Sequence, residues 1–380
     1  MAELQPDKSG CETKKQPQHP TPFHKLTGLM RNRLRNRQRD TGFLCHLTRI
    51  LVCAAIAHVE LHAFAYSQQT IQARPPETQP SSITLPVSYQ RQVLIVTLTD
   101  PKIGLLHMLL DSGAETTILN GAAATRGNID RNARPFDAAQ GSGSEQSLVQ
   151  GAIHVDLHAA STPVFSTTAA VLDLRRVSRA MPQPIDGLLG WDFFQHWCIR
   201  LDYSHQQITL TPPNTCKAPA GKHATLVGEW LMEGFLLPAH LTFNPTQSAD
   251  ALLHLDTGAD PAIALSNRFL KFATIKDPPQ PGHGIGGDFT NDYTELSSAD
   301  LDHGSLVFHG APIPTFIARK GGFSNGHWWN TGRAEARLNR DGVVGNGLLQ
   351  SLTLTFDPIH RRIYTEVALP PSQPSFDTRP

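Results

Sequence analysis

Apolar residues between positions 83 and 368 fall into short alternating runs that have the length of β-strands. Gly, Pro, Asn and Asp residues separate the runs, and long helical periodicity is scarce. Alternation with a period of two is typical of strands that bury one face. The predicted strands are residues 92–99, 105–110, 152–157, 165–172 and 199–210, and then 229–243, 251–255, 306–308, 315–318 and 352–364. The pattern therefore predicts an all-β fold.

Changes in composition divide the 380 residues further, and the length leaves room for two domains. Residues 66–82 are rich in Gln, Ser and Pro, which predicts a flexible tether. Prolines at 212 and 213 and the stretch that follows predict a linker at 214–222, and the tail at 369–380 is expected to be disordered. We therefore expect an N-terminal lobe at 83–213 and a C-terminal lobe at 223–368.

A short motif occurs twice, 145 residues apart. Residues 110–114 read Leu-Asp-Ser-Gly-Ala, and residues 255–259 read Leu-Asp-Thr-Gly-Ala, each after an apolar run. An isoleucine follows each Asp by seven positions, at Ile118 and Ile263. One such triplet is a weak signal, but two copies with matched flanks are much less expected by chance.

A second repeat aligns without a gap at an offset of 155 residues. Its matched pairs are Gly190 and Gly345, Gln195 and Gln350, Asp202 and Asp357, His205 and His360, and Ile208 and Ile363. Each glycine follows an apolar pair, and a segment that can form one or two helical turns comes after it, at 191–197 and 346–351. The larger offset indicates a net insertion of ten residues in the second half, most naturally at 320–340. The two repeats together predict two similar β domains.

Formal charge balances over the whole chain, but the first 65 residues carry ten Lys and Arg against five Asp and Glu. The remainder is slightly acidic, so we expect no nucleic-acid binding. A basic run at 31–39, a short apolar run at 50–57 and Ala63-Phe64-Ala65 predict a signal peptide in residues 1–65, cleaved before Tyr66. Met30 directly precedes the basic run and is the expected start. An uncleaved amphipathic or anchoring segment is the alternative.

Three of the five cysteines lie in that leader, which leaves Cys198 and Cys216. The two can form a disulfide in an oxidising compartment. Alternatively, Cys198 is buried in an apolar run and Cys216 is free in the linker.

The duplicated aspartates suit hydrolysis of an amide by water. Two close carboxylates cannot both ionise freely, so Asp111 and Asp256 would share a proton and supply both a base and an acid. Hydroxyl groups on Ser112 and Thr257 can hydrogen-bond across the interface between the lobes. Gly113 and Gly258 permit tight turns. The later glycines, Gly190 and Gly345, allow a second chain segment to pack behind each aspartate loop.

With these motifs the chain resembles a retropepsin-like aspartic protease, in a bacterial single-chain form with both lobes fused, over residues 83–368. The resemblance implies two pseudo-symmetric β-barrel lobes with a cleft between them, a water held between the aspartates, and a hairpin flap. Glycine-rich candidates for flaps are Gly141, Ser142 and Gly143 in the first lobe and Gly284, Ile285 and Gly286 in the second. The alternative is that these residues form ordinary turns.

One departure from the pepsin-like motif affects the expected pH dependence. Ala114 and Ala259 stand where pepsin-like relatives carry Ser or Thr, whose hydroxyl can stabilise the ionised carboxylate. Loss of that hydrogen bond raises the apparent pKa of the pair. We therefore hypothesise a pH optimum closer to neutrality than that of pepsin.

These observations favour an exported, periplasmic or secreted, aspartic endopeptidase that acts on extended polypeptide. No His-Glu-x-x-His or Cys-x-x-Cys spacing occurs, and we expect no metal and no cofactor. We expect a monomer without stable membrane insertion after signal cleavage, since symmetry within one chain replaces a dimer. The alternative is a non-catalytic bilobal peptide-binding module of the cell envelope.

Overall fold

The computed structural model describes residues 82–127, 138–140, 146–284, 287–320 and 340–367, all within one compact unit that spans residues 79–380. The predicted signal peptide, almost all of the tether and the tail lie outside the described residues. Within the described part of the chain, no helix is both long and apolar enough to cross a membrane.

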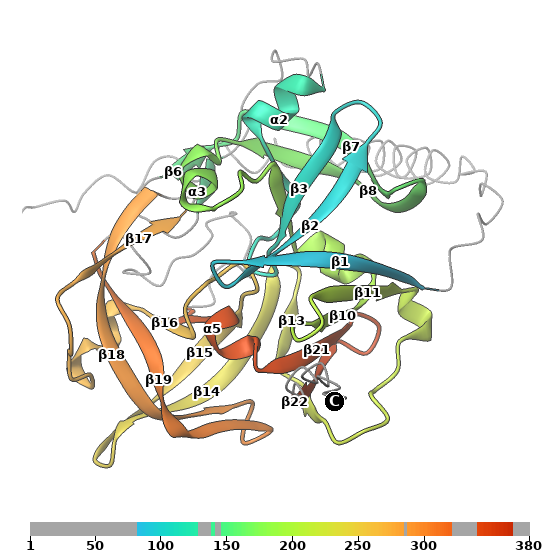
Figure 1. Cartoon of the computed structure of the whole chain (residues 1–380). Helices are drawn as coiled ribbons and strands as arrows, with labels where there is room; N and C mark the ends of the chain where they lie inside the picture. The colour runs from blue at the N-terminus through green and yellow to red at the C-terminus, as the bar shows by residue number, and fades with distance from the viewer. Residues whose placement is uncertain (1–81, 128–137, 141–145, 285–286, 321–339, 368–380) are drawn as a thin grey trace, which may run out of the picture. The chain divides into compact units, whose positions relative to one another are not determined.

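The first lobe is a closed barrel of six strands (Figure 1). In spatial order the strands are β2 (Val93–Asp100), β3 (Gly104–Leu110), β9 (Gly187–Leu189), β4 (Ile118–Asn120), β8 (Thr162–Leu172) and β7 (Gly151–Ala159). A pairing of Thr99 with His158 joins β7 to β2 and closes the barrel. Apolar side chains such as Leu98, Leu106 and Met108 fill its core.

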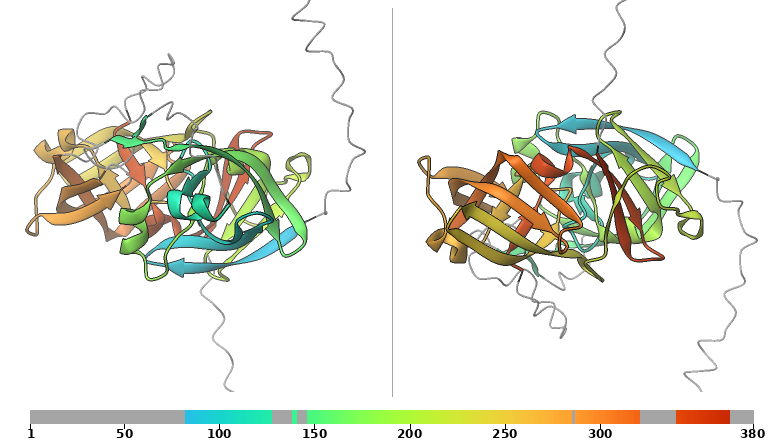
Figure 2. Two further views of the ribbon diagram at one scale, coloured as in Figure 1. Left: turned by 90° about the horizontal axis from the view of Figure 1, so that it is seen from above. Right: turned by 90° about the horizontal axis from the view of Figure 1, so that it is seen from below.

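The second lobe is another closed barrel of six strands. It contains β14 (Gly234–Asn244), β15 (Gln247–Leu255), β20 (Gly342–Val344), β16 (Ile263–Leu265), β19 (Leu306–Lys320) and β18 (Gly287–Leu301). Four residue pairs between β14 and β18 close it. Figure 2 shows the two barrels next to each other from above and from below. The fold is therefore all-β with two pseudo-symmetric barrel lobes, which confirms the predicted fold class.

Six further strand segments form a sheet to which both lobes contribute. Its order is β12 (Ala224–Leu226), β22 (Arg362–Val367), β21 (Leu352–Asp357), β10 (Cys198–Asp202), β11 (Gln207–Thr211) and β1 (Ile83–Gln90). At its centre Arg200 pairs with Thr355, its own counterpart at the offset of 155. The flanking pairs, Ile199 with Phe356 and Leu201 with Leu354, exchange under the same offset. This self-complementary register places a pseudo-twofold axis between Arg200 and Thr355.

The strand registers also locate the ten-residue difference between the lobes. Ile118 pairs with Ala170, and Ile263 pairs with Thr315, so both positions keep the offset of 145. Gly187 and Gly342, which pair with β3 and β15, are 155 residues apart. The additional residues therefore lie between β19 and β20, which is where the sequence pattern put them.

Short elements complete the described structure. They are the helices α2 (Gly121–Arg126), α3 (Arg175–Ala180), α4 (Trp191–His196) and α5 (Asn346–Leu349), the 3-10 turns η1 (Pro213–Thr215) and η2 (Asn267–Lys271), and the strands β5 (Ala138–Gln140), β6 (Gln146–Leu148), β13 (Glu229–Leu231) and β17 (Gln280–Gly284). Trp191, Phe194 and Phe356 pack together and connect α4 to β21, with ring centroids 4.8 to 6.4 Å apart.

Three predicted strands are wrong in extent, because residues 199–210, 229–243 and 352–364 are hairpins. In the first, Asp202 Oδ1 accepts the His205 amide at 3.1 Å, and Gln206 has a φ of 49°. In the last, Asp357 accepts the His360 amide at 3.0 Å, and Arg361 has a φ of 54°. The repeated Asp and His are thus turn residues, and the alternation continues through the turn because both strands face the same core.

The strands around β18 and β19 also differ from the prediction. Residues 306–308 and 315–318 belong to one strand, β19. Its neighbour β18 was not predicted, because its sequence is polar and several of its side chains are exposed.

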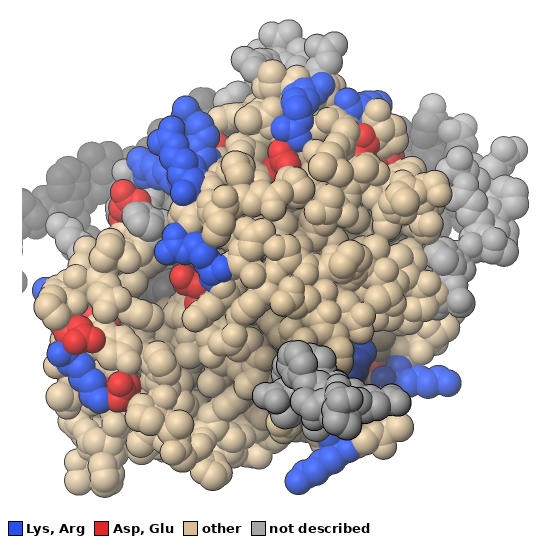
Figure 3. Space-filling model, in the orientation of Figure 1, with Lys and Arg blue, Asp and Glu red and all other residues tan. Residues whose placement is uncertain are grey.

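On the face drawn in Figure 3, Lys and Arg side chains lie mainly near the edges, several of them beside Asp or Glu.

Candidate active site

Each motif aspartate directly follows a barrel strand, Asp111 after β3 and Asp256 after β15. The Asp111 amide donates to the Leu189 carbonyl, and the Asp256 amide donates to the Val344 carbonyl, both at 3.0 Å. The strand that precedes each later glycine, β9 or β20, therefore holds the base of its own aspartate loop. The two loops are built in the same way.

The hydroxyl groups next to the aspartates connect the loops across the lobe interface, as their positions in the sequence suggested. The Ser112 amide donates to Thr257 Oγ1, and the Thr257 amide donates to Ser112 Oγ, both at 3.0 Å. Ser112 Oγ then donates to the Leu255 carbonyl, and Thr257 Oγ1 to the Leu110 carbonyl, both at 2.9 Å. Both side chains are fully buried. These four bonds fix the two aspartate loops relative to each other.

Each motif glycine lies against the carboxyl group of the opposite lobe. A Cβ atom on Gly113 would be 2.5 Å from Asp256 Oδ1, and one on Gly258 would be 2.5 Å from Asp111 Oδ1. Real Cβ atoms do not approach other atoms this closely. Only glycine at these two positions allows the carboxyl groups to meet.

The later glycines bring the chain close behind the aspartate loops. A Cβ on Gly190 would overlap the Thr116 carbonyl, and a Cβ on Gly345 would lie 2.7 Å from the Ala259 carbonyl oxygen. The residues that follow complete the contact, because the Trp191 amide donates to the Ala114 carbonyl at 2.7 Å and the Asn346 amide to the Ala259 carbonyl at 2.9 Å.

The two carboxyl groups form a hydrogen-bonded pair. Asp111 Oδ1 accepts the amides of Gly113 and Ala114 at 3.0 Å, and Asp256 Oδ1 accepts the Gly258 amide at 2.8 Å. Burial raises the pKa of Asp256 well above its ordinary value, and the charge of Asp111 raises it further. Burial also raises the pKa of Asp111, while the hydrogen bond from Asp256 and the two amides oppose that rise. The arrangement therefore favours a proton on Asp256 and an ionised Asp111.

One residue that supports the second aspartate loop was missed in the sequence. Asn346 is fully buried, donates to the Thr257 carbonyl at 2.6 Å and accepts the Tyr203 hydroxyl from the first lobe at 2.6 Å.

Asp186 and Asp341 form equivalent ion pairs, with Arg126 at 2.8 Å and Arg268 at 2.6 Å. These two aspartates are 155 residues apart, each before a glycine, so the second repeat already contained a signal for them.

The candidate flap residues are only partly described. Strands β5 and β6 form one hairpin, whose tip, with Gly141, Ser142 and Gly143, lies outside the described residues. Strands β17 and β18 form the other, in which Gly284 pairs with Gly287. Ile285 and Gly286 lie outside the described residues. Both candidate segments thus connect the strands of hairpins.

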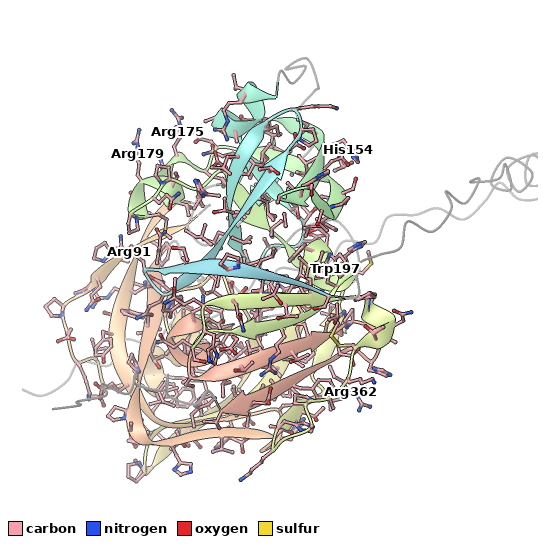
Figure 4. All side chains as sticks on the ribbon, turned by 45° about the vertical axis from the view of Figure 1, so that its right-hand side comes forward. Arg91, His154, Arg175, Arg179, Trp197 and Arg362 are labelled. Atoms are coloured by element: carbon pink, nitrogen blue, oxygen red, sulfur yellow. A yellow bond between two sulfur atoms is a disulfide. The ribbon has the colours of Figure 1, made fainter. Side chains whose placement is uncertain are left out.

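A disulfide joins Cys198, at the start of β10, to Cys216, directly after η1, with their Cα atoms 5.5 Å apart (Figure 4). The neighbouring Trp197 indole donates to the Val164 carbonyl at 2.9 Å. Among the described residues no group of three or more His, Cys, Asp or Glu side chains is arranged to hold a metal ion.

A family match in the first lobe supports a protease-like function. Residues 101–193, which include Asp111 and Gly190, match the family model described as aspartyl protease. The aspartic proteinase from Irpex lacteus is a structural match at 10% identity, with a TM-score of 0.44, over 77% of this chain and 99% of that one. A search of curated proteins finds no match to the sequence. The family match over residues 101–193 confirms the resemblance to aspartyl proteases that the paired motifs indicated.

Proposed function

We propose that the chain is an aspartic endopeptidase in which Asp111 and Asp256 jointly activate a water molecule. One observation carries the proposal. A carboxyl group from each lobe meets the other in a hydrogen-bonded pair, at loops that are locked together by Ser112 and Thr257. Such a pair shares one proton and can supply a base and an acid at the same time.

The environment of each carboxyl group suggests its role. The pKa of Asp256 is raised well above its ordinary value, and Asp256 hydrogen-bonds to Asp111, so Asp111 is assigned as the ionised base that takes a proton from water. The water oxygen attacks the carbonyl carbon while Asp256 transfers its proton to the carbonyl oxygen. The tetrahedral intermediate then collapses: the C–N bond breaks, the proton held by Asp111 passes to the leaving nitrogen, and one hydroxyl group of the intermediate returns its proton to Asp256 as the carbonyl re-forms.

The hairpins β5–β6 and β17–β18 are proposed to close over an extended substrate. Closure of this kind excludes bulk water and positions the scissile bond. Helix α3 of the first lobe packs against β17 of the second, so residues of both lobes border this hairpin.

Export is a further part of the proposal, and the disulfide supports it, because disulfides persist in oxidising compartments. Sequencing the N-terminus of the mature protein tests it. A start at Tyr66 is expected, whereas an intact start at Met1 would contradict signal cleavage.

A diverse peptide library tests the activity itself. Incubation between pH 3 and 8 should give cleavage that a transition-state-like inhibitor of aspartic proteases abolishes. Binding of peptides without cleavage at any pH would instead indicate a non-catalytic peptide-binding module.

A further inference from the structure

A buried cluster of charged and polar side chains lies beside Asp256 in the second lobe. Arg340 is only 3% exposed, and its Nη2 atom lies 3.6 Å from Glu233 Oε1. Its Nη1 atom lies 3.3 Å from Nδ1 of His254, which is completely buried. Burying a guanidinium is energetically unfavourable unless the group is paired. The contacts with Glu233 and His254 are therefore needed to hold Arg340 in this buried position.

The strands bring this cluster close to the aspartate pair. His254 is the last residue but one of β15, and Asp256 directly follows the end of that strand. Strand β20 begins two residues after Arg340 and runs parallel to β15, with His254 opposite Val343. The Arg340 guanidinium contacts His254 and lies near enough to Asp256 for the two charges to interact.

The first lobe is an internal reference, because its equivalent positions are apolar. The offsets of 145 and 155 relate His254 to Leu109 and Arg340 to Ile185. Leu109 pairs with Ile95 and His254 with Leu236, so Gly234 corresponds to Val93. Leu109, Ile185 and Val93 belong to one buried hydrophobic cluster in the first lobe.

The three differences in the second lobe depend on one another. A Cβ on Gly234 would collide with the His254 imidazole, so glycine replaces valine where histidine replaces leucine. The imidazole in turn contacts Arg340, and Glu233 directly precedes Gly234. The six barrel strands pair in the same order in both lobes, so these three differences occur within a shared framework.

The charges around Arg340 come from several elements. Burial lowers the pKa of Arg340, and Glu233 in the β13–β14 turn, Glu115 in the first aspartate loop and Asp256 oppose that decrease. Burial and then Arg340 hold the pKa of His254 well below its ordinary value, so His254 stays neutral. The attraction between Arg340 and Asp256 is reciprocal, so the arginine stabilises the ionised carboxylate. Among the described residues, Asp111 is the other carboxyl group of the aspartate pair, and Asp341, directly after Arg340, is paired with Arg268.

We propose that Arg340 is a positioning residue, a fixed positive charge that Glu233 and His254 restrain. This charge shifts the pH range in which the aspartate pair holds one proton to lower pH. The inference rests on the proposed function of that pair. It adds that the second lobe carries an electrostatic control which the first lobe lacks.

Titration of the pair itself tests the inference without any need for turnover. The probe is ¹³C NMR of aspartate carboxyl groups in the full chain, with the Asp111 and Asp256 signals assigned from Asp→Asn variants. Arg340→Met should move the titration up by roughly half a pH unit or more, and Glu233→Gln should move it down. The double variant Arg340→Met/Glu233→Gln should titrate near the parent.

Two controls separate charge from structural damage. Arg126→Met removes a partly exposed arginine of the first lobe and should leave the titration of the pair unchanged. Arg340→Lys keeps a charge and should restore most of the shift caused by methionine. If Arg340→Met does not fold, Glu233→Gln alone decides the matter.

Shifts of the same sign in Arg340→Met and Glu233→Gln, or no shift beyond that of Arg126→Met, would overturn the inference. Peptide cleavage is measured separately. If the two variants shift the titration in opposite directions but the protein cleaves no peptide, the electrostatic role of Arg340 stands and the proposed function is wrong. If the protein cleaves peptides but neither variant shifts the titration, the proposed function stands and the role of Arg340 is wrong.

Discussion

Ser112 and Thr257 each connect the two aspartate loops by accepting one hydrogen bond and donating another across the lobe interface. Neither side chain reaches solvent. Removal of one hydroxyl therefore leaves buried backbone groups without partners, which costs more than the net value of an ordinary hydrogen bond.

Ser112→Ala is expected to lower the free energy of unfolding by roughly 1–3 kcal/mol per orphaned group. Ser112→Thr is the matched control, because threonine fills the equivalent position in the other lobe and keeps the hydroxyl. Urea denaturation of both variants gives the measurement. Equal stability of the two variants would contradict the proposed contribution of the hydroxyl.

The alanines after the motif glycines set a testable pH dependence. In Ala114→Ser/Ala259→Ser, hydroxyl groups that donate to the ionised carboxylates would lower the pKa of the pair, which burial has raised. The pH profile of peptide cleavage should therefore move to lower pH. An unchanged profile would refute the hypothesis that these alanines bring the optimum toward neutrality.

The central residues of the site could be predicted because their signals are local. Asp111, Asp256 and their glycines are identified by short motifs, and the structure brings them together. Arg340 and Glu233 could not be found in this way, since neither belongs to a repeated motif. Their importance appears only when strand pairing shows that the first lobe has Ile185 where the second has Arg340.

At the scale of elements, the sheet to which both lobes contribute is built from hairpins, and the Cys198–Cys216 disulfide links it to a neighbouring segment. Alternation located many of the longer strands, because each buries one face, but not short strands that are buried on both faces, such as β9 and β20. It could not find the ends of hairpins such as β10–β11, whose turn depends on the Asp202 side chain and a positive φ at Gln206. It also missed β18, where polar side chains hide the strand pattern.

The Cys198–Cys216 disulfide ties β10 to the segment after η1, with a sequence separation of 18. Replacing both cysteines by alanine should lower the free energy of unfolding by roughly 2–4 kcal/mol, because a loop of this length is constrained in the unfolded chain. Urea denaturation with and without reductant measures the effect. The parent protein should match the variant under reducing conditions; a difference that persists there would assign the loss to packing instead.

At the scale of the whole molecule, the pseudo-twofold axis between Arg200 and Thr355 relates the barrels, the aspartate loops and the glycine contacts. Some departures from this symmetry lie near the site. Trp191 donates to the Leu231 carbonyl at 2.9 Å, whereas its counterpart Asn346 supports the Thr257 carbonyl. Symmetry builds the aspartate pair, and the asymmetric residues give its two members different surroundings.

Both aspartates, one from each lobe, are proposed to carry out the same hydrolysis. The most direct measurement compares initial rates of peptide cleavage for the parent, Asp111→Asn and Asp256→Asn, with circular dichroism to verify folding. Each variant should stay folded and lose at least about a thousandfold in rate, since an amide can replace neither the base nor the acid. A folded variant that cleaves peptides at a rate near that of the parent would contradict the account.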